Sequence, residues 1–221
     1  MMGSQGMGKE TNRDFDEVLE ARRTVRSFTD EVPARELVEK VIRAGLLAPY
    51  ASLAVSEGDV FRRFFVIPKG SDIAARAEAI LRAGVVVSSA AIDEAIAENE
   101  EFRVLAAKFA VMLRSLAGGA QFGFESPPYW IIVAERKGFP PNQARSLAHV
   151  MHSMWLKATA LGLGFRLISA ATQMGDNEEF CALLGIPAGQ FELDSCVIGY
   201  ARVAPEPTWR PALEETVTWF E

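Results

Sequence analysis

Three arginines and a hydroxyl stand close together near the start of the chain, at Arg22, Arg23, Thr24 and Arg26. A guanidinium carries a permanent charge, and its planar fork of N–H donors can pair with two oxygens of one phosphate group. The residue types leave two interpretations of this cluster. It is either a basic turn exposed to solvent, or a site for an anionic ligand such as a phosphate.

The cluster is unusual because the whole chain is acidic, with 221 residues and a formal net charge of −6. A nucleic-acid binder needs a surplus of lysine and arginine, so we expect no nucleic-acid partner. The longest stretch without a charged residue, 44–56, is too short to cross a bilayer, and no early apolar run resembles a secretory signal. Two cysteines, Cys181 and Cys196, are too few for a disulfide framework. We therefore expect a cytoplasmic protein without a membrane partner.

The elements that position the cluster follow from the spacing of apolar residues. We expect a disordered tail over 1–14, followed by a single α+β domain over 15–221 with a mixed or antiparallel central sheet between long helices. Helices are expected over 15–22, 33–48, 71–118 (a helical excursion), 144–161 and 178–184. Strands are expected over 61–68, 129–134, 165–169 and 193–203, with 216–220 as a further edge strand in an extended C-terminal tail over 205–221.

Several short motifs, taken in order, resemble the nitroreductase family of FMN-dependent oxidoreductases. The arginine cluster between two helices is the first of them. The others are Val32-Pro33, Ala48-Pro49, Gly162-Leu163-Gly164, Leu184–Pro187, Ile198–Tyr200 and Arg210-Pro211. The set covers most of residues 15–215. The resemblance implies a three-layer fold and a homodimer with FMN at the subunit interface.

The resemblance also assigns flavin-binding residues. The arginine cluster matches the family's first flavin segment, which holds the phosphate and ribityl chain, and Arg26 best matches the basic residue at the N1/O2 edge of the ring. Arg210 matches a phosphate-binding arginine near the C-terminus. A fixed cation near N1 favours the reduced flavin, which carries negative charge there. The residues that match the segment facing the N5/O4 edge through backbone amides are Ile168, Ser169 and Ala170. Several family members have an acidic residue and a glycine in place of Ser169 and Ala170.

The chain departs from the family pattern after Pro49. Many members continue with a serine, an asparagine that contacts the flavin ring, and Gln-Pro-Trp, and this chain has neither the asparagine nor Gln-Pro-Trp. We expect Ser52 or a backbone group to replace the asparagine contact, and Tyr50 to add an aromatic wall. The departure bears on substrate choice and flavin potential more than on flavin binding.

The reaction implied by the resemblance needs no catalytic side chain of its own. NADH or NADPH gives a hydride to flavin N5, and a nitroaromatic, quinone or similar small acceptor then takes the electrons in a ping-pong cycle. Two alternatives stay open: a relative with another flavin reaction, such as flavin fragmentation or dehalogenation, and a non-catalytic flavin-binding or storage protein. His149 and His152 lie one helical turn apart with no third ligand, so we expect no metal site. Trp155 is expected in the core or at the subunit interface.

Overall fold

The computed structural model describes residues 15–50 and 60–220. The tail expected over 1–14 and the contact expected from Ser52 lie outside these residues. A four-stranded sheet with the strand order β1-β2-β4-β3 forms the middle of the molecule. The strands are β1 (Arg62–Pro68), β2 (Tyr129–Arg136), β3 (Gly164–Leu167) and β4 (Phe191–Gly199). All three strand pairings are antiparallel.

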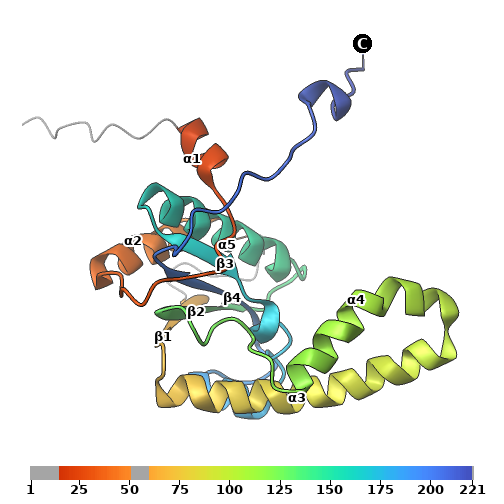
Figure 1. Cartoon of the computed structure of the whole chain (residues 1–221). Coiled ribbons are helices and arrows are strands. Elements are labelled where there is room, and N and C mark those ends of the chain that lie inside the picture. The colour runs from red at the N-terminus through yellow and green to blue at the C-terminus, as the bar shows by residue number, and fades with distance from the viewer. Residues whose placement is uncertain (1–14, 51–59, 221) are drawn as a thin grey trace, which may run out of the picture.

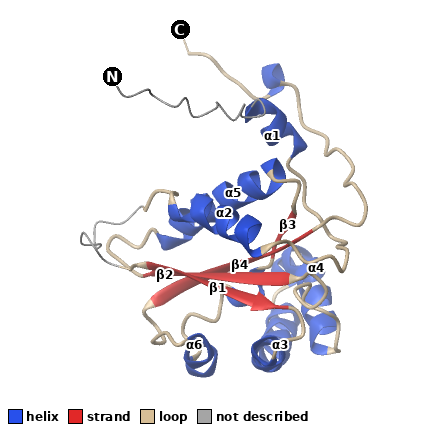
Figure 2. Cartoon of the chain, turned by 90° about the vertical axis from the view of Figure 1, so that its left-hand side faces the viewer, coloured by secondary structure: helices blue, strands red, loops and turns tan. Residues whose placement is uncertain are grey.

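Helices cover both faces of the sheet, which confirms the α+β class and the three-layer arrangement (Figures 1 and 2). α2 and α5 pack against each other on one face, and α3 and α6 lie on the other (Figure 2). Because both faces are covered, residues 131–134 of β2 have no exposed surface. The helices are α1 (Phe15–Ala21), α2 (Arg35–Leu46), α3 (Asp72–Glu98), α4 (Glu100–Ala117), α5 (Gln143–Ala160) and α6 (Glu178–Leu184). None of the described helices is long and apolar enough to span a membrane.

The helical segment expected over 71–118 is a hairpin of α3 and α4 that projects from the body (Figure 1). The two helices separate at Asn99, whose backbone is extended and whose side chain accepts a hydrogen bond from the Phe102 amide at 3.0 Å. This side-chain cap starts the second helix. Ala106, Ala110 and Leu113 are buried on α4, while most of its other large apolar side chains are exposed. The exposed ones are Phe102, Val104, Leu105, Phe109, Val111 and Met112.

The chain after β4 runs away from the body (Figure 1). The prediction of an edge strand over 216–220 is wrong. These residues pair with no strand and follow a single 3-10 turn, η2 (Leu213–Glu215). The segment has residue types that favour strands, but no strand of the described sheet offers it a partner. Residues 206–220 are all exposed, with Trp219 and Phe220 at 86% and 94%.

Candidate functional site

The arginine cluster lies on the segment between α1 and α2, and this segment is attached to β3. The Val25 amide donates to the Phe165 carbonyl at 3.0 Å, and Thr24 forms a parallel bridge with Phe165. Val25 is buried against Gly164, where an added Cβ would lie 3.0 Å from the valine side chain. Gly164 therefore lets the arginine segment approach the sheet closely.

The same segment is attached to the chain just beyond β4. The Arg202 amide donates to the Ser27 carbonyl at 2.9 Å, and Arg202 Nε donates to the Phe28 carbonyl at 3.1 Å. Phe28 is buried beside Gly199, where an added Cβ would lie 3.0 Å from the phenylalanine ring. These contacts explain why the strand expected over 193–203 ends at Gly199, since the residues after it pair with the arginine segment.

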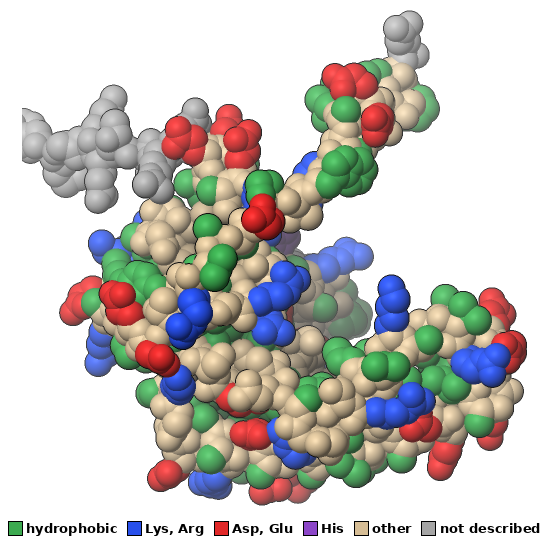
Figure 3. Space-filling view, in the orientation of Figure 1, with side chains coloured by type: hydrophobic (Ala, Val, Ile, Leu, Met, Phe, Trp, Pro, Cys, Tyr) green, Lys and Arg blue, Asp and Glu red, His purple; other side chains and the backbone are tan. Residues whose placement is uncertain are grey.

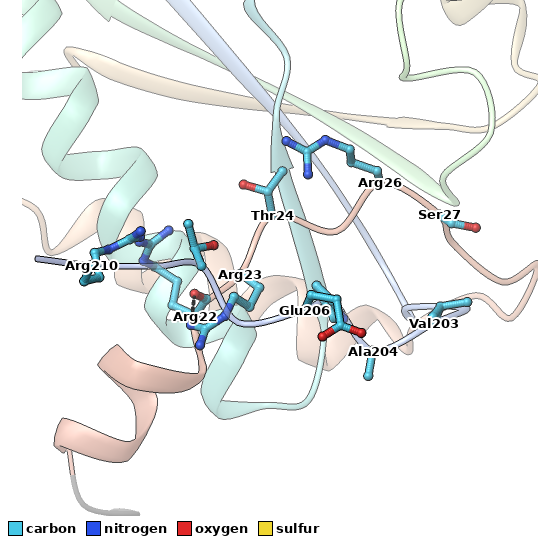
Figure 4. Close-up of a pocket in the computed structure, with 11 residues that line it drawn as sticks. Arg22, Arg23, Thr24, Arg26, Ser27, Val203, Ala204, Glu206 and Arg210 are labelled. Carbon is cyan, nitrogen blue, oxygen red and sulfur yellow. Dashed lines mark hydrogen bonds between the residues drawn. The ribbon is translucent and has the colours of Figure 1, made fainter.

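The arginine segment and the start of the C-terminal tail line a hollow of about 500 Å³ (Figure 4). Its size is in the range of small-molecule sites. Glu206 is the one carboxylate among its described lining residues, so positive charge dominates the hollow. Its lining residues include the four arginines and the threonine predicted from the sequence, Arg22, Arg23, Thr24, Arg26 and Arg210. The structure thus brings together five of the ten residues predicted to bind the cofactor.

Two of the four arginines are already held by their surroundings. Arg23 Nη1 donates to the carbonyls of Glu20 and Arg22, the second at 2.9 Å, and so satisfies carbonyl groups at the end of α1. The guanidinium carbon of Arg22 lies 4.4 Å from the ring centroid of Trp155. Arg23 therefore has a structural role, while Arg22 keeps its N–H donors.

Arg26 and Arg210 have few partners in their own chain. Arg210 Nη1 donates to the Trp209 carbonyl at 2.9 Å, and Arg26 has no hydrogen-bond or ion-pair partner within residues 15–50 and 60–220. In Figure 4, Arg22 and Arg210 lie at one end of the hollow, and Arg26 lies beyond Thr24 at the other. The hollow can therefore hold an elongated ligand with an anionic group at one end and an electron-rich edge at the other.

Tyr50 does not line the hollow of its own chain. Its hydroxyl donates to the Arg136 carbonyl at 3.0 Å, and its ring centroid lies 4.4 Å from that of Phe61. These contacts place it beside the C-terminal end of β2. The role expected for Tyr50 stays a prediction.

Ile168, Ser169 and Ala170 follow β3 and also lie apart from the arginine-lined hollow. The strand expected over 165–169 ends at Leu167, and a 3-10 turn, η1 (Ser169–Ala171), begins after it. The Ile168 amide donates to the Ser195 carbonyl at 2.9 Å, so this amide is used within the protein. If the segment contacts a flavin edge, the amides of Ser169 and Ala170 are the remaining donors.

A half-buried carboxyl group, Asp194, lies on the strand next to this segment. Leu167 pairs with Cys196 in the β3–β4 ladder, and continuing this register places Asp194 level with Ser169. Burial raises the pKa of Asp194 to about 6, although its Oδ1 accepts a hydrogen bond from the Ser195 amide at 2.7 Å. The raised pKa means that ionised Asp194 destabilises the folded protein at neutral pH.

Replacing this carboxyl by an amide is expected to stabilise the protein at neutral pH. The folded pKa of Asp194, about 6, lies above the ordinary value of 3.8, so the stability falls as the pH rises from about 4 to 6. Asp194→Asn keeps an acceptor for the Ser195 amide and should raise the free energy of unfolding by about 1–3 kcal/mol at pH 8 and by little at pH 4. Urea unfolding at the two pH values checks this, with the exposed Glu31→Gln as control. An equal increase in the free energy of unfolding at both pH values would contradict this role of the Asp194 charge.

The fold and the site define an α+β protein with an arginine-lined hollow beside the segment that joins β3 and the chain after β4. The model of the nitroreductase family matches residues 19–200, and the chain belongs to this family. The resemblance inferred from the ordered motifs is thereby confirmed. No curated protein matches the chain.

Solved structures share the fold over nearly the whole chain. A Bacteroides fragilis nitroreductase with bound FMN has a TM-score of 0.67 at 18% identity, and the match covers 94% of this chain and 99% of that one. A Desulfitobacterium hafniense nitroreductase with bound FMN has a TM-score of 0.62 at 22% identity, covering 94% and 98%. An FMN- and NADPH-dependent nitroreductase from Sphigopyxis sp. strain HMH has a TM-score of 0.60 at 18% identity, covering 94% and 99%.

Sequence reasoning missed Trp155, which contacts the arginine segment directly. Its indole Nε1 donates to the Arg23 carbonyl at 3.1 Å. A signal was present, because α5 leads through a short turn into β3, and Trp155 lies about one and a half turns before the end of that helix. The pairing of β3 with the arginine segment is a long-range contact that periodicity does not reveal.

Proposed function

We propose that the chain is an FMN-dependent oxidoreductase that takes a hydride from NADH or NADPH and reduces a nitroaromatic, quinone or similar small acceptor. The hollow of about 500 Å³, with arginines at both ends, carries this proposal. The family membership and the FMN named for two of the similar structures support it.

The residues of the hollow fit FMN. Arg22 and Arg210 would hold the phosphate, because both are donors without a carboxylate partner in the described residues. The Thr24 hydroxyl, between the two ends of the hollow, would contact the ribityl chain of the flavin. Arg26 would place a fixed positive charge at the N1 edge of the ring. When bound, FMN supplies the hydride and electron transfer between the reductant and the acceptor. The chain binds the cofactor, orients it and holds charge beside it.

We also propose that the protein acts as a homodimer with the flavin at the subunit boundary. Hydrophobic side chains gather on the projecting hairpin and along the C-terminal tail, where their own chain does not cover them (Figure 3). A soluble protein seldom leaves so much apolar surface uncovered without a partner. Light scattering of the FMN-loaded protein should give about twice the chain mass of 24.2 kDa. A single-chain mass at micromolar concentration would contradict the dimer.

Anaerobic reduction tests the proposed function. Protein loaded with FMN should be yellow and should lose its absorbance when mixed with NADH or NADPH in a stopped-flow instrument. Re-oxidation by a quinone or nitroaromatic compound would complete the cycle. A flavin that stays oxidised with both reductants would contradict the proposal and favour a storage protein.

A further inference from the structure

Trp155 of α5 contacts the arginine segment in two ways. Its indole Nε1 donates to the backbone carbonyl of Arg23 at 3.1 Å. The guanidinium carbon of Arg22 lies 4.4 Å from the centroid of the same ring, which is within cation–π distance. One side chain therefore holds both the backbone and a charged group of the cluster.

The tryptophan ring is itself held in place. It stacks on Phe165 of β3, with the ring centroids 5.2 Å apart and the planes 20° from parallel. Phe165 forms the bridge with Thr24, and its carbonyl accepts the Val25 amide. The helix, the strand and the arginine segment thus meet at this pair of rings, so the position of the Trp155 ring sets that of Arg22.

The kind of contact matters for the ligand. A carboxylate partner would use the N–H donors of Arg22 and neutralise its charge, whereas a cation–π contact leaves these donors for another acceptor. Arg22 has no carboxylate partner among the described residues. Trp155 therefore restrains Arg22 while keeping it able to bind a phosphate group.

We propose that Trp155 is a positioning residue that makes the site selective for a phosphorylated flavin. The inference rests on the proposed function, FMN binding in this hollow. Trp155 is not among the lining residues, so it acts through Arg22 and does not touch the ligand. Its loss lowers the affinity for FMN and leaves the affinity for riboflavin, which has the same ring system without the phosphate, nearly unchanged.

Titration of the full-chain apoprotein with FMN and with riboflavin, followed by flavin fluorescence, tests this inference. Trp155→Phe keeps a ring beneath Arg22 but removes the N–H donor, and Trp155→Leu removes both. We expect the FMN affinity to fall about threefold for the first variant and about tenfold for the second, with riboflavin within about twofold. Trp130→Phe is the matched control, because this buried indole N–H has no partner in the described residues. It should leave the ratio of the two affinities unchanged.

Two results would overturn the role of Trp155. Equal losses for FMN and riboflavin would mean that it maintains the whole pocket, and an unchanged FMN affinity in both variants would mean that it does not position Arg22. Circular dichroism checks that each variant folds. If Trp155→Leu does not fold, the affinities of Trp155→Phe alone test the inference. Failure of the proposed FMN binding would be visible in the unsubstituted protein itself, which would bind FMN no more tightly than riboflavin. That result would overturn the role of Trp155 as well.

Discussion

Replacing Arg62 by leucine is expected to lower the free energy of unfolding by about 3–5 kcal/mol, because it leaves a buried carboxylate without its cation. Arg62 Nε donates to Glu135 Oε2 at 2.7 Å, and the two side chains are 2% and 0% exposed. The other oxygen of Glu135 has no hydrogen-bond partner in the described residues, so the arginine is the main group that compensates this buried charge.

Arg62 also satisfies the end of α2. Its Nη1 donates to the carbonyls of Gly45 and Ala48 at 2.8 and 2.9 Å, and its Nη2 donates to Ser146 Oγ at 3.3 Å. The Gly45 carbonyl also accepts the Ala48 amide at 3.2 Å, so leucine at position 62 would remove one of its two donors. The Ala48 carbonyl would lose its donor, which costs free energy when the group is buried. The substitution should therefore also loosen the residues after α2, which lead to Tyr50.

A double substitution separates the charge from the packing. Arg62→Leu/Glu135→Leu removes both charges and should regain much of the stability lost in Arg62→Leu, as measured by urea unfolding. Arg35→Leu is the surface control, because the Arg35–Glu39 pair is exposed. Its loss should leave the midpoint urea concentration of unfolding unchanged. If the effects of the two single substitutions simply added, the account of the buried pair would be wrong.

The buried pair also shows what the sequence could not reveal. The apolar residues of β1 and β2 predicted two buried strands, and both strands are present. Arg62 stands at the start of one strand and Glu135 near the end of the other, where each resembles a solvent-exposed end residue. Only the antiparallel register, which places them directly opposite each other, turns them into one buried pair.

The candidate site was predictable in part for a similar reason. The spacing of Arg22 to Arg26 made an anion site one of two interpretations, because the charged groups lie in neighbouring residues of the sequence. The Gly162-Leu163-Gly164 turn was predicted from local sequence, and Gly162 does have the positive φ of 72° that such a turn requires. The role of Gly164 in admitting Val25 depends on a contact between segments far apart in the chain, which local patterns do not report.

The largest effect on cofactor binding is expected from removing both arginines at the end of the hollow that we propose to hold the phosphate. Each charge-assisted hydrogen bond contributes about 1.5–3 kcal/mol, so Arg22→Ala/Arg210→Ala should weaken FMN binding by about 100-fold or more. Each single substitution should cost about tenfold. Both residues line the hollow and are exposed or partly exposed, so the variant should fold like the unsubstituted protein.

The matched control removes the same charge elsewhere. Arg43→Ala/Arg76→Ala takes two exposed guanidiniums from α2 and α3, outside the hollow, so a general loss of positive charge would weaken FMN binding equally in both double variants. Because a direct ion pair is screened by salt, the unsubstituted protein should also lose FMN affinity more steeply with added salt than the Arg22→Ala/Arg210→Ala variant does. An FMN affinity that is the same in the two double variants would show that the phosphate does not bind at this end of the hollow.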